Sequence, residues 1–107
     1  MELKEYLTEA GISPFGAWFE ELDPQAAARV TVALARMENG NLVNAKGVGA
    51  GVMECRIDAG PGYRIYFGRD GDTLIILLAG GTKRRQQKDI AAAQSCWAEY
   101  KKRKKGS

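Results

Sequence analysis

Four polar side chains stand out because they fall on the same side of two neighbouring predicted strands. Glu54 and Arg56 alternate with apolar residues in VMECRID, and Arg64 and Tyr66 do so in YRIYFGR. Same-face residues of adjacent antiparallel strands lie about 5 Å apart, so the four are expected to share one solvent-facing surface. A guanidinium group binds two phosphate oxygens at once, and a phenol can stack on a base or share a proton. The pattern indicates a phosphate-binding groove, or else an ordinary surface ion pair of Glu54 with an arginine.

Further cations follow the next predicted strand, TLIILLAG, which ends at Gly80 and Gly81. Lys83, Arg84 and Arg85 come directly after this strand. They lie beside Arg64 only if the strand registers place the end of this strand next to Arg64. Lys46 sits in a glycine-rich segment, NGNLVNAKGVGAG, that is expected to be a loop. The GxGxG pattern in this segment precedes a strand and lacks the GK[ST] ending of a phosphate-binding loop.

The composition fits one soluble domain over residues 1–107, because 107 residues with 45% hydrophobic content suffice for a single core. No apolar run of about 18 residues is present, and the N-terminus does not resemble a signal peptide, so we expect a cytoplasmic protein without a membrane partner. Two cysteines without CxxC spacing, and no histidine, support neither a zinc site nor a disulfide framework. No metal and no cofactor is therefore expected.

The charge is divided unevenly along the chain. The net charge is +3, but residues 83–107 carry +7 and the preceding residues −4. Such asymmetry indicates a polyanionic partner at one end of the fold. The run KKRKK, within a basic tail at about residues 101–107, is equally consistent with a solvated terminus.

The remaining elements follow from caps and periodicity. ELKEYL is an edge strand or the start of a helix. Ser13 and Asp23 are predicted N-caps, each followed by a proline, of two helices that form a hairpin broken at Leu22 to Pro24. The second helix is expected to end at Asn39 and Gly40. Three strands in a meander come next, joined by AGPG and by the Asp-Gly turn of RDGD, and Thr82 is expected to cap a final helix. This order predicts a single α+β domain.

The run from KGVGAGVMECRIDAGPGYRIYF through LLAGGTKRRQQKDIAAA resembles the addiction module killer proteins of bacteria, a HigB-like branch of the RelE/ParE toxin superfamily. With WFEELD and the ARV helix, the likeness covers roughly residues 13–95. The resemblance implies a small antiparallel sheet with two N-terminal helices packed on it and a C-terminal helix. It also implies a type II toxin with a cognate antitoxin protein as partner.

Two activities occur among the proteins that this chain resembles. Many relatives are ribosome-dependent mRNA endonucleases that inhibit translation by cutting mRNA in the 30S A site, without a metal. The ParE branch instead inhibits DNA gyrase and cuts no RNA. A third hypothesis, which rests on the basic tail, is a general nucleic-acid-binding module with salt-sensitive affinity.

The resemblance also assigns site residues. Arg64 matches the strand arginine that follows Gly-Tyr in RelE-like toxins, Arg56 replaces a strand lysine, and Lys83 or Arg84 falls near the basic residue after the last strand. Lys46, Arg85 and Lys88 are further candidate RNA-binding residues. Near Asp89 the tyrosine of the family's final helix is absent, and so are the histidines of other relatives. Glu54 and Tyr66 are the remaining candidates for proton transfer.

Overall fold

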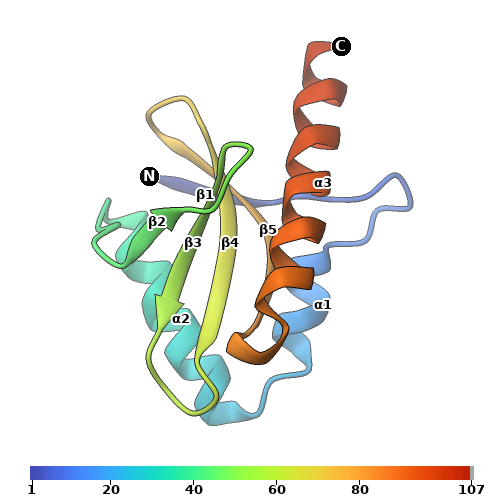
Figure 1. Cartoon of the computed structure of the whole chain (residues 1–107). Helices are drawn as coiled ribbons and strands as arrows, with labels where there is room; N and C mark the ends of the chain where they lie inside the picture. The colour runs from blue at the N-terminus through green and yellow to red at the C-terminus, as the bar shows by residue number, and fades with distance from the viewer. Residues whose placement is uncertain (107) are drawn as a thin grey trace.

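A computed structural model describes residues 1–106 and shows a sheet with helices on both faces (Figure 1). In chain order the elements are β1 (Glu2–Glu5), α1 (Pro14–Glu20), α2 (Pro24–Glu38), β2 (Ala45–Gly47), β3 (Val52–Ile57), β4 (Tyr63–Asp70), β5 (Leu74–Thr82), the 3-10 helix η1 (Lys83–Arg85) and α3 (Gln86–Lys105). The strand order across the sheet is β1-β5-β4-β3-β2. The α+β prediction is confirmed.

The two N-terminal helices begin where their caps predict. The Ser13 hydroxyl accepts a hydrogen bond of 2.8 Å from the Gly16 N–H, and the Asp23 carboxylate accepts one of 2.9 Å from the Ala26 N–H. Each cap satisfies a backbone donor that the first helical turn leaves without an intrahelical partner. A proline follows each cap at a position that needs no N–H donor.

The sheet is mixed, so the prediction of a purely antiparallel sheet is wrong. The meander β3-β4-β5 is antiparallel as expected, but β1 pairs with β5 in parallel. Four residues of strand carry no signal of their pairing direction. The segment predicted as a loop contains β2, a three-residue edge strand that places Lys46 opposite Glu54.

Each face of the sheet has its own apolar core. Phe15 of α1 and Val30 of α2 pack against strand residues such as Phe67 on one face. On the other face, Trp97 of α3 packs over a set that includes Tyr66. The face of β3 and β4 that we expected to meet solvent is therefore largely covered by α3. This correction changes the environment of every polar residue on that face.

Two glycines allow the helices to lie close to the sheet. A Cβ atom on Gly68 of β4 would lie 2.5 Å from the Trp97 ring, and one on Gly80 of β5 would overlap the Trp18 ring. Both approaches are far closer than ordinary van der Waals contact. Glycine is required at both positions, and Gly68 in particular lets α3 approach β4 closely.

The last helix begins later than its predicted cap. Thr82 ends β5, and its side chain makes no capping hydrogen bond. The turn η1 follows, and α3 begins at Gln86. At the other end, the basic residues Lys101 to Lys105 form the last turns of α3, which rise beyond the sheet at the top of Figure 1.

Candidate functional site

Three polar residues form a buried cluster between the sheet and the start of α3. Glu54 is 0% exposed, Arg64 6% and Tyr66 0%. Glu54 and Tyr66 occupy paired positions on β3 and β4, and Arg64 is two residues before Tyr66 on the same face. The expectation that these three lie on an open surface is wrong, because α3 and η1 cover them.

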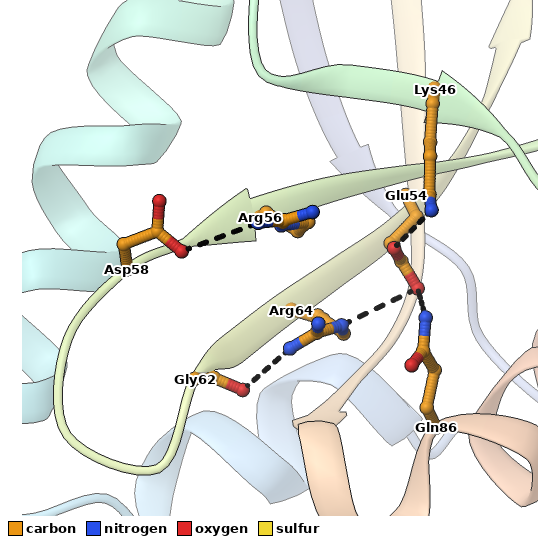
Figure 2. Close-up of polar contacts among 7 residues, drawn as sticks. All are labelled: Lys46, Glu54, Arg56, Asp58, Gly62, Arg64 and Gln86. Carbon is orange, nitrogen blue, oxygen red and sulfur yellow. Dashed lines mark hydrogen bonds and ion pairs between the residues drawn. The ribbon is translucent and has the colours of Figure 1, made fainter.

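The carboxylate of Glu54 is the centre of this cluster (Figure 2). Its Oε2 accepts a hydrogen bond of 2.9 Å from the Gln86 amide and lies 3.6 Å from Nε of Arg64. Nζ of Lys46 lies 4.0 Å from Oε1. Burying a carboxylate is costly unless cations and hydrogen bonds replace the water it has lost. Arg64 and Gln86 provide that environment.

Arg64 is held on both sides of its guanidinium group. Nη1 donates a hydrogen bond of 2.9 Å to the Gly62 carbonyl, while Nε faces Glu54 (Figure 2). The Nε atom itself has no hydrogen-bond partner among the described residues. The guanidinium group is thus fixed in orientation and retains donor capacity.

Tyr66 and Asp89 are two further acidic groups near Glu54 and Arg64, and the pKa of each is raised. Burial raises the pKa of the Tyr66 phenol, and the negative charge of Glu54 raises it further. The phenol therefore stays protonated at neutral pH and is unsuited to act as a base. Asp89 of α3 lies over Gly81, where a Cβ atom would collide with its carboxylate, and burial raises the pKa of Asp89.

A set of cations lies at the margin of the cluster, all of them exposed except Arg64. Arg56 occupies the position opposite Arg64 on β3, and its side chain is 50% exposed with Asp58 3.7 Å away. The Lys83 N–H donates a hydrogen bond of 2.9 Å to the Gly62 carbonyl, beside Arg64. We call Arg56, Arg64 and Lys83, with the exposed Arg84, Arg85 and Lys88 that follow, the cationic edge.

The strand registers decide which predicted residues meet. Arg64 pairs with Gly81 at the end of β5, which brings Lys83 to the same edge as Arg64 and Arg56. Lys46 instead lies across Glu54, on β2. Sequence reasoning missed Gln86 and Asp89 as members of the site. Their position, four to seven residues after the end of a strand that borders Arg64, is the signal that points to them.

A wide groove lies on the opposite side of β3 from α3. It has a volume of about 710 Å³ and is lined by α2, by the segment after it and by the end of β3. Arg29, Arg36 and Arg56 contribute three positive charges to the lining, with Asp58 as its acidic residue. Val32 is 50% exposed and Val43 80% exposed within the same lining.

Among residues 1–106 no group of three or more His, Cys, Asp and Glu side chains is arranged to hold a metal ion. No helix in that part of the chain combines the length and the apolar character needed to cross a bilayer. Cys55 is a buried thiol and Cys96 a half-buried one, and neither is in a disulfide.

Two comparisons with known proteins bear on this geometry. The profile of a family described as phage derived protein Gp49-like matches residues 17–97, which run from α1 to Trp97 of α3. An uncharacterized protein of Haemophilus influenzae is 40% identical over 81 residues, covering 75% of this chain and 82% of that protein. Residues 17–97, which the family profile matches, contain the whole buried cluster and the cationic edge.

Proposed function

We propose that this chain, which belongs to the Gp49-like family within the RelE/ParE-like toxin superfamily, is the toxin of a type II toxin-antitoxin pair. The family is related to toxin-antitoxin systems, which supports a toxin role. We further propose a HigB-like activity, the ribosome-dependent cleavage of mRNA. The cationic edge is the site at which this chain engages the RNA.

The observation that carries the proposal is the convergence of Arg56, Arg64 and Lys83 from three strand ends. Arg56 and Arg64 are cross-strand neighbours, so their guanidinium groups can bind one phosphate from two directions. Glu54 lies 3.6 Å from Arg64 and Asp58 3.7 Å from Arg56, so each charge is already partly offset, and the remaining guanidinium donors are the groups that a phosphate would engage. A phosphodiester is an anion of suitable shape and charge.

The proposed reaction needs no metal. The ribose 2′-oxygen attacks the adjacent phosphorus, the bond from phosphorus to the 5′-oxygen breaks, and a 2′,3′-cyclic phosphate and a 5′-hydroxyl result. The proton lost by the 2′-hydroxyl passes to a carboxylate base, and the departing 5′-oxygen takes a proton from solvent water. The cations of the edge stabilise the charge that develops on the phosphorane oxygens.

Proton transfer falls to Glu54 rather than Tyr66, since the raised pKa of Tyr66 keeps its phenol protonated. Glu54 is covered by Gln86, and its first role is to hold Arg64 in place. We therefore propose that the rate rests mainly on positioning of the RNA by the cationic edge and the ribosome. Gln86 occupies Oε2 of Glu54, whereas Oε1 has no hydrogen-bond partner among the described residues and is the oxygen that would accept the proton.

The partner of the toxin is proposed to be a cognate antitoxin that binds in the groove beside α2. Three arginines with one aspartate favour an acidic segment, and the exposed Val32 and Val43 favour one with an apolar side. Arg29→Glu is expected to weaken binding of the antitoxin encoded next to this gene by about 10-fold or more, as Kd by titration calorimetry. Arg69→Glu, an exposed arginine outside the groove, is the matched control, and equal losses would remove the groove from the proposal.

The alternative is inhibition of DNA gyrase without RNA cleavage. Inducing the chain without its antitoxin separates the two activities. The proposal expects new mRNA 5′ ends by primer extension within minutes and unchanged plasmid supercoiling. Intact mRNA together with trapped gyrase-DNA complexes would contradict mRNA cleavage and support inhibition of gyrase.

A further inference from the structure

A second concave surface lies at the far end of β4 from the cationic edge. It is a shallow pocket of about 410 Å³, where the last turns of α3 pass the hairpin between β4 and β5. We call it the tip surface; its lining residues are Arg69, Asp70, Trp97, Tyr100, Lys101, Lys104 and Lys105. Arg69 is five residues from Arg64 along β4, which corresponds to about 17 Å at the rise of a strand.

The base of the tip surface is rigid and aromatic. The rings of Trp97 and Tyr100 stack with centroids 5.3 Å apart and planes 6° apart. Trp97 is fixed against Gly68, and the Tyr100 hydroxyl donates a hydrogen bond of 2.6 Å to Asp70. Nζ of Lys101 lies 5.7 Å from the centre of the Trp97 ring.

Cations dominate the rim of this surface. Arg69, Lys101, Lys104 and Lys105 line the surface together with one carboxylate, that of Asp70, which Lys104 and Tyr100 already engage. The helix dipole favours cations only within the last turn of α3. It does not account for Arg69, which comes from β4, or for Lys101, one turn earlier. The convergence of cations from two elements needs a different reason.

We propose that the tip surface binds the phosphodiester backbone of RNA at a second site, distinct from the cationic edge. Trp97 is 5% exposed and is not free to stack on a base, so the proposal rests on the cations that β4 and α3 bring to one surface, which can contact successive phosphates. The lining contains no Val, Leu or Ile side chain, and its four cations stand beside a single carboxylate, which favours an anionic ligand over an apolar protein segment. The choice of RNA over DNA rests on the proposed function, while the phosphate-binding chemistry does not.

The test is a salt titration of binding by the full chain. The probes are a fluorescein-labelled 20-nucleotide single-stranded RNA and a 20-base-pair DNA duplex, read by fluorescence anisotropy. The variant Arg69→Gln, Lys101→Gln, Lys105→Gln removes three rim cations and leaves the Lys104 pair with Asp70 in place. For the RNA we expect the slope of log K against log salt to fall by about 2, and affinity to fall about 100-fold at 0.1 M salt.

The matched control is Lys4→Gln, Arg29→Gln, Arg36→Gln, which makes the same change in net charge at exposed positions elsewhere. An equal loss in this control would overturn the proposal, because net charge alone would then explain the binding. Tighter binding of the DNA duplex through the tip residues would overturn the assignment to RNA. Both variants keep Arg56, Arg64 and Lys83. Absence of mRNA cleavage by the wild-type chain, with RNA binding at the tip surface intact, would refute the proposed function and leave this site standing.

Discussion

Arg64 and Arg56 occupy paired positions on adjacent strands, yet they lie in opposite environments. Arg64 is buried between Glu54 and the Gly62 carbonyl, whereas half of the Arg56 side chain meets solvent beside Asp58. The sequence around them is alike, since each precedes an isoleucine in a strand. The difference arises from η1 and α3, which cover β4 and leave the end of β3 open.

This contrast teaches that the two arginines serve the site in different ways. A buried guanidinium group fixed by a carboxylate is preorganised and costs nothing to orient when an anion arrives. An exposed one is free to move and to meet a ligand first. Substituting Arg64 is therefore expected to reduce both activity and stability, whereas substituting Arg56 should reduce activity alone. The following variants test this difference.

The largest expected effect is on stability at Arg64. Arg64→Ala leaves Glu54 buried without its cation, and we expect a loss of about 3–5 kcal/mol in the free energy of unfolding. Arg56→Ala removes only an exposed pair and should cost about 0–1 kcal/mol. Urea denaturation of both variants measures the difference. Similar losses for the two would contradict the buried environment of Arg64.

The second prediction removes both charges of the buried pair. The double variant Glu54→Gln, Arg64→Met leaves no uncompensated charge, and the amide oxygen introduced on β3 would still accept a hydrogen bond from Gln86. We expect this variant to be more stable than Arg64→Ala by about 2 kcal/mol or more, because a buried ion pair is often replaced at little net cost. A double-mutant cycle by urea denaturation tests this, and simple additivity of the single losses would argue that the pair is not coupled.

A smaller effect is expected at Asp89, on the covered side. Burial raises its pKa, so the ionised carboxylate weakens the fold at neutral pH, and protonation relieves this as the pH falls. Asp89→Asn is therefore expected to raise the melting temperature at pH 7 by a few degrees at most. The gain should vanish below about pH 4, where an unfolded aspartate also protonates. A gain that persists at pH 3 would point to a different cause.

The smallest effect concerns Asp70, the last residue of β4, which bonds Tyr100 and Lys104 of α3. A hydrogen bond from Lys104 and a smaller contribution from the Tyr100 hydrogen bond hold the pKa of Asp70 below its ordinary value. Its contribution to stability is therefore present above about pH 4 and is lost as the pH falls through the lowered pKa. Wild type should melt slightly above Asp70→Asn at pH 7 and level with it near pH 2, where both carboxyl and amide are uncharged. Asp58→Asn, at an exposed pair with Arg56, serves as the comparison.

Local signals in the sequence predicted the local structure well. The caps Ser13 and Asp23 start α1 and α2 where expected, and the Asp-Gly turn gives the β4-β5 hairpin. The alternation in β3 and β4 also sorted their residues onto the correct faces. A cap or a tight turn depends on a few adjacent residues, which the sequence displays directly.

The covering of the site was not predictable in the same way. Nothing in the alternation of Arg64 and Tyr66 tells which helix lies above them, because α3 is brought there by a distant segment. The burial of Glu54 and the entry of Gln86 and Asp89 both follow from that placement. The parallel pairing of β1 depends likewise on long-range packing that four residues do not encode.

The central claim is that the cationic edge directs RNA cleavage on the ribosome. The most direct measurement is primer extension on an mRNA held in purified ribosomes, after addition of wild-type chain or of Arg56→Ala, Lys83→Ala. Both positions are exposed, so the variant is expected to fold, which thermal melting checks. The account predicts cleavage within the A-site codon by wild type and a loss of about 100-fold or more in the variant, on the scale of a lost oxyanion donor. Equal cleavage by the two proteins, or none by wild type, would contradict it.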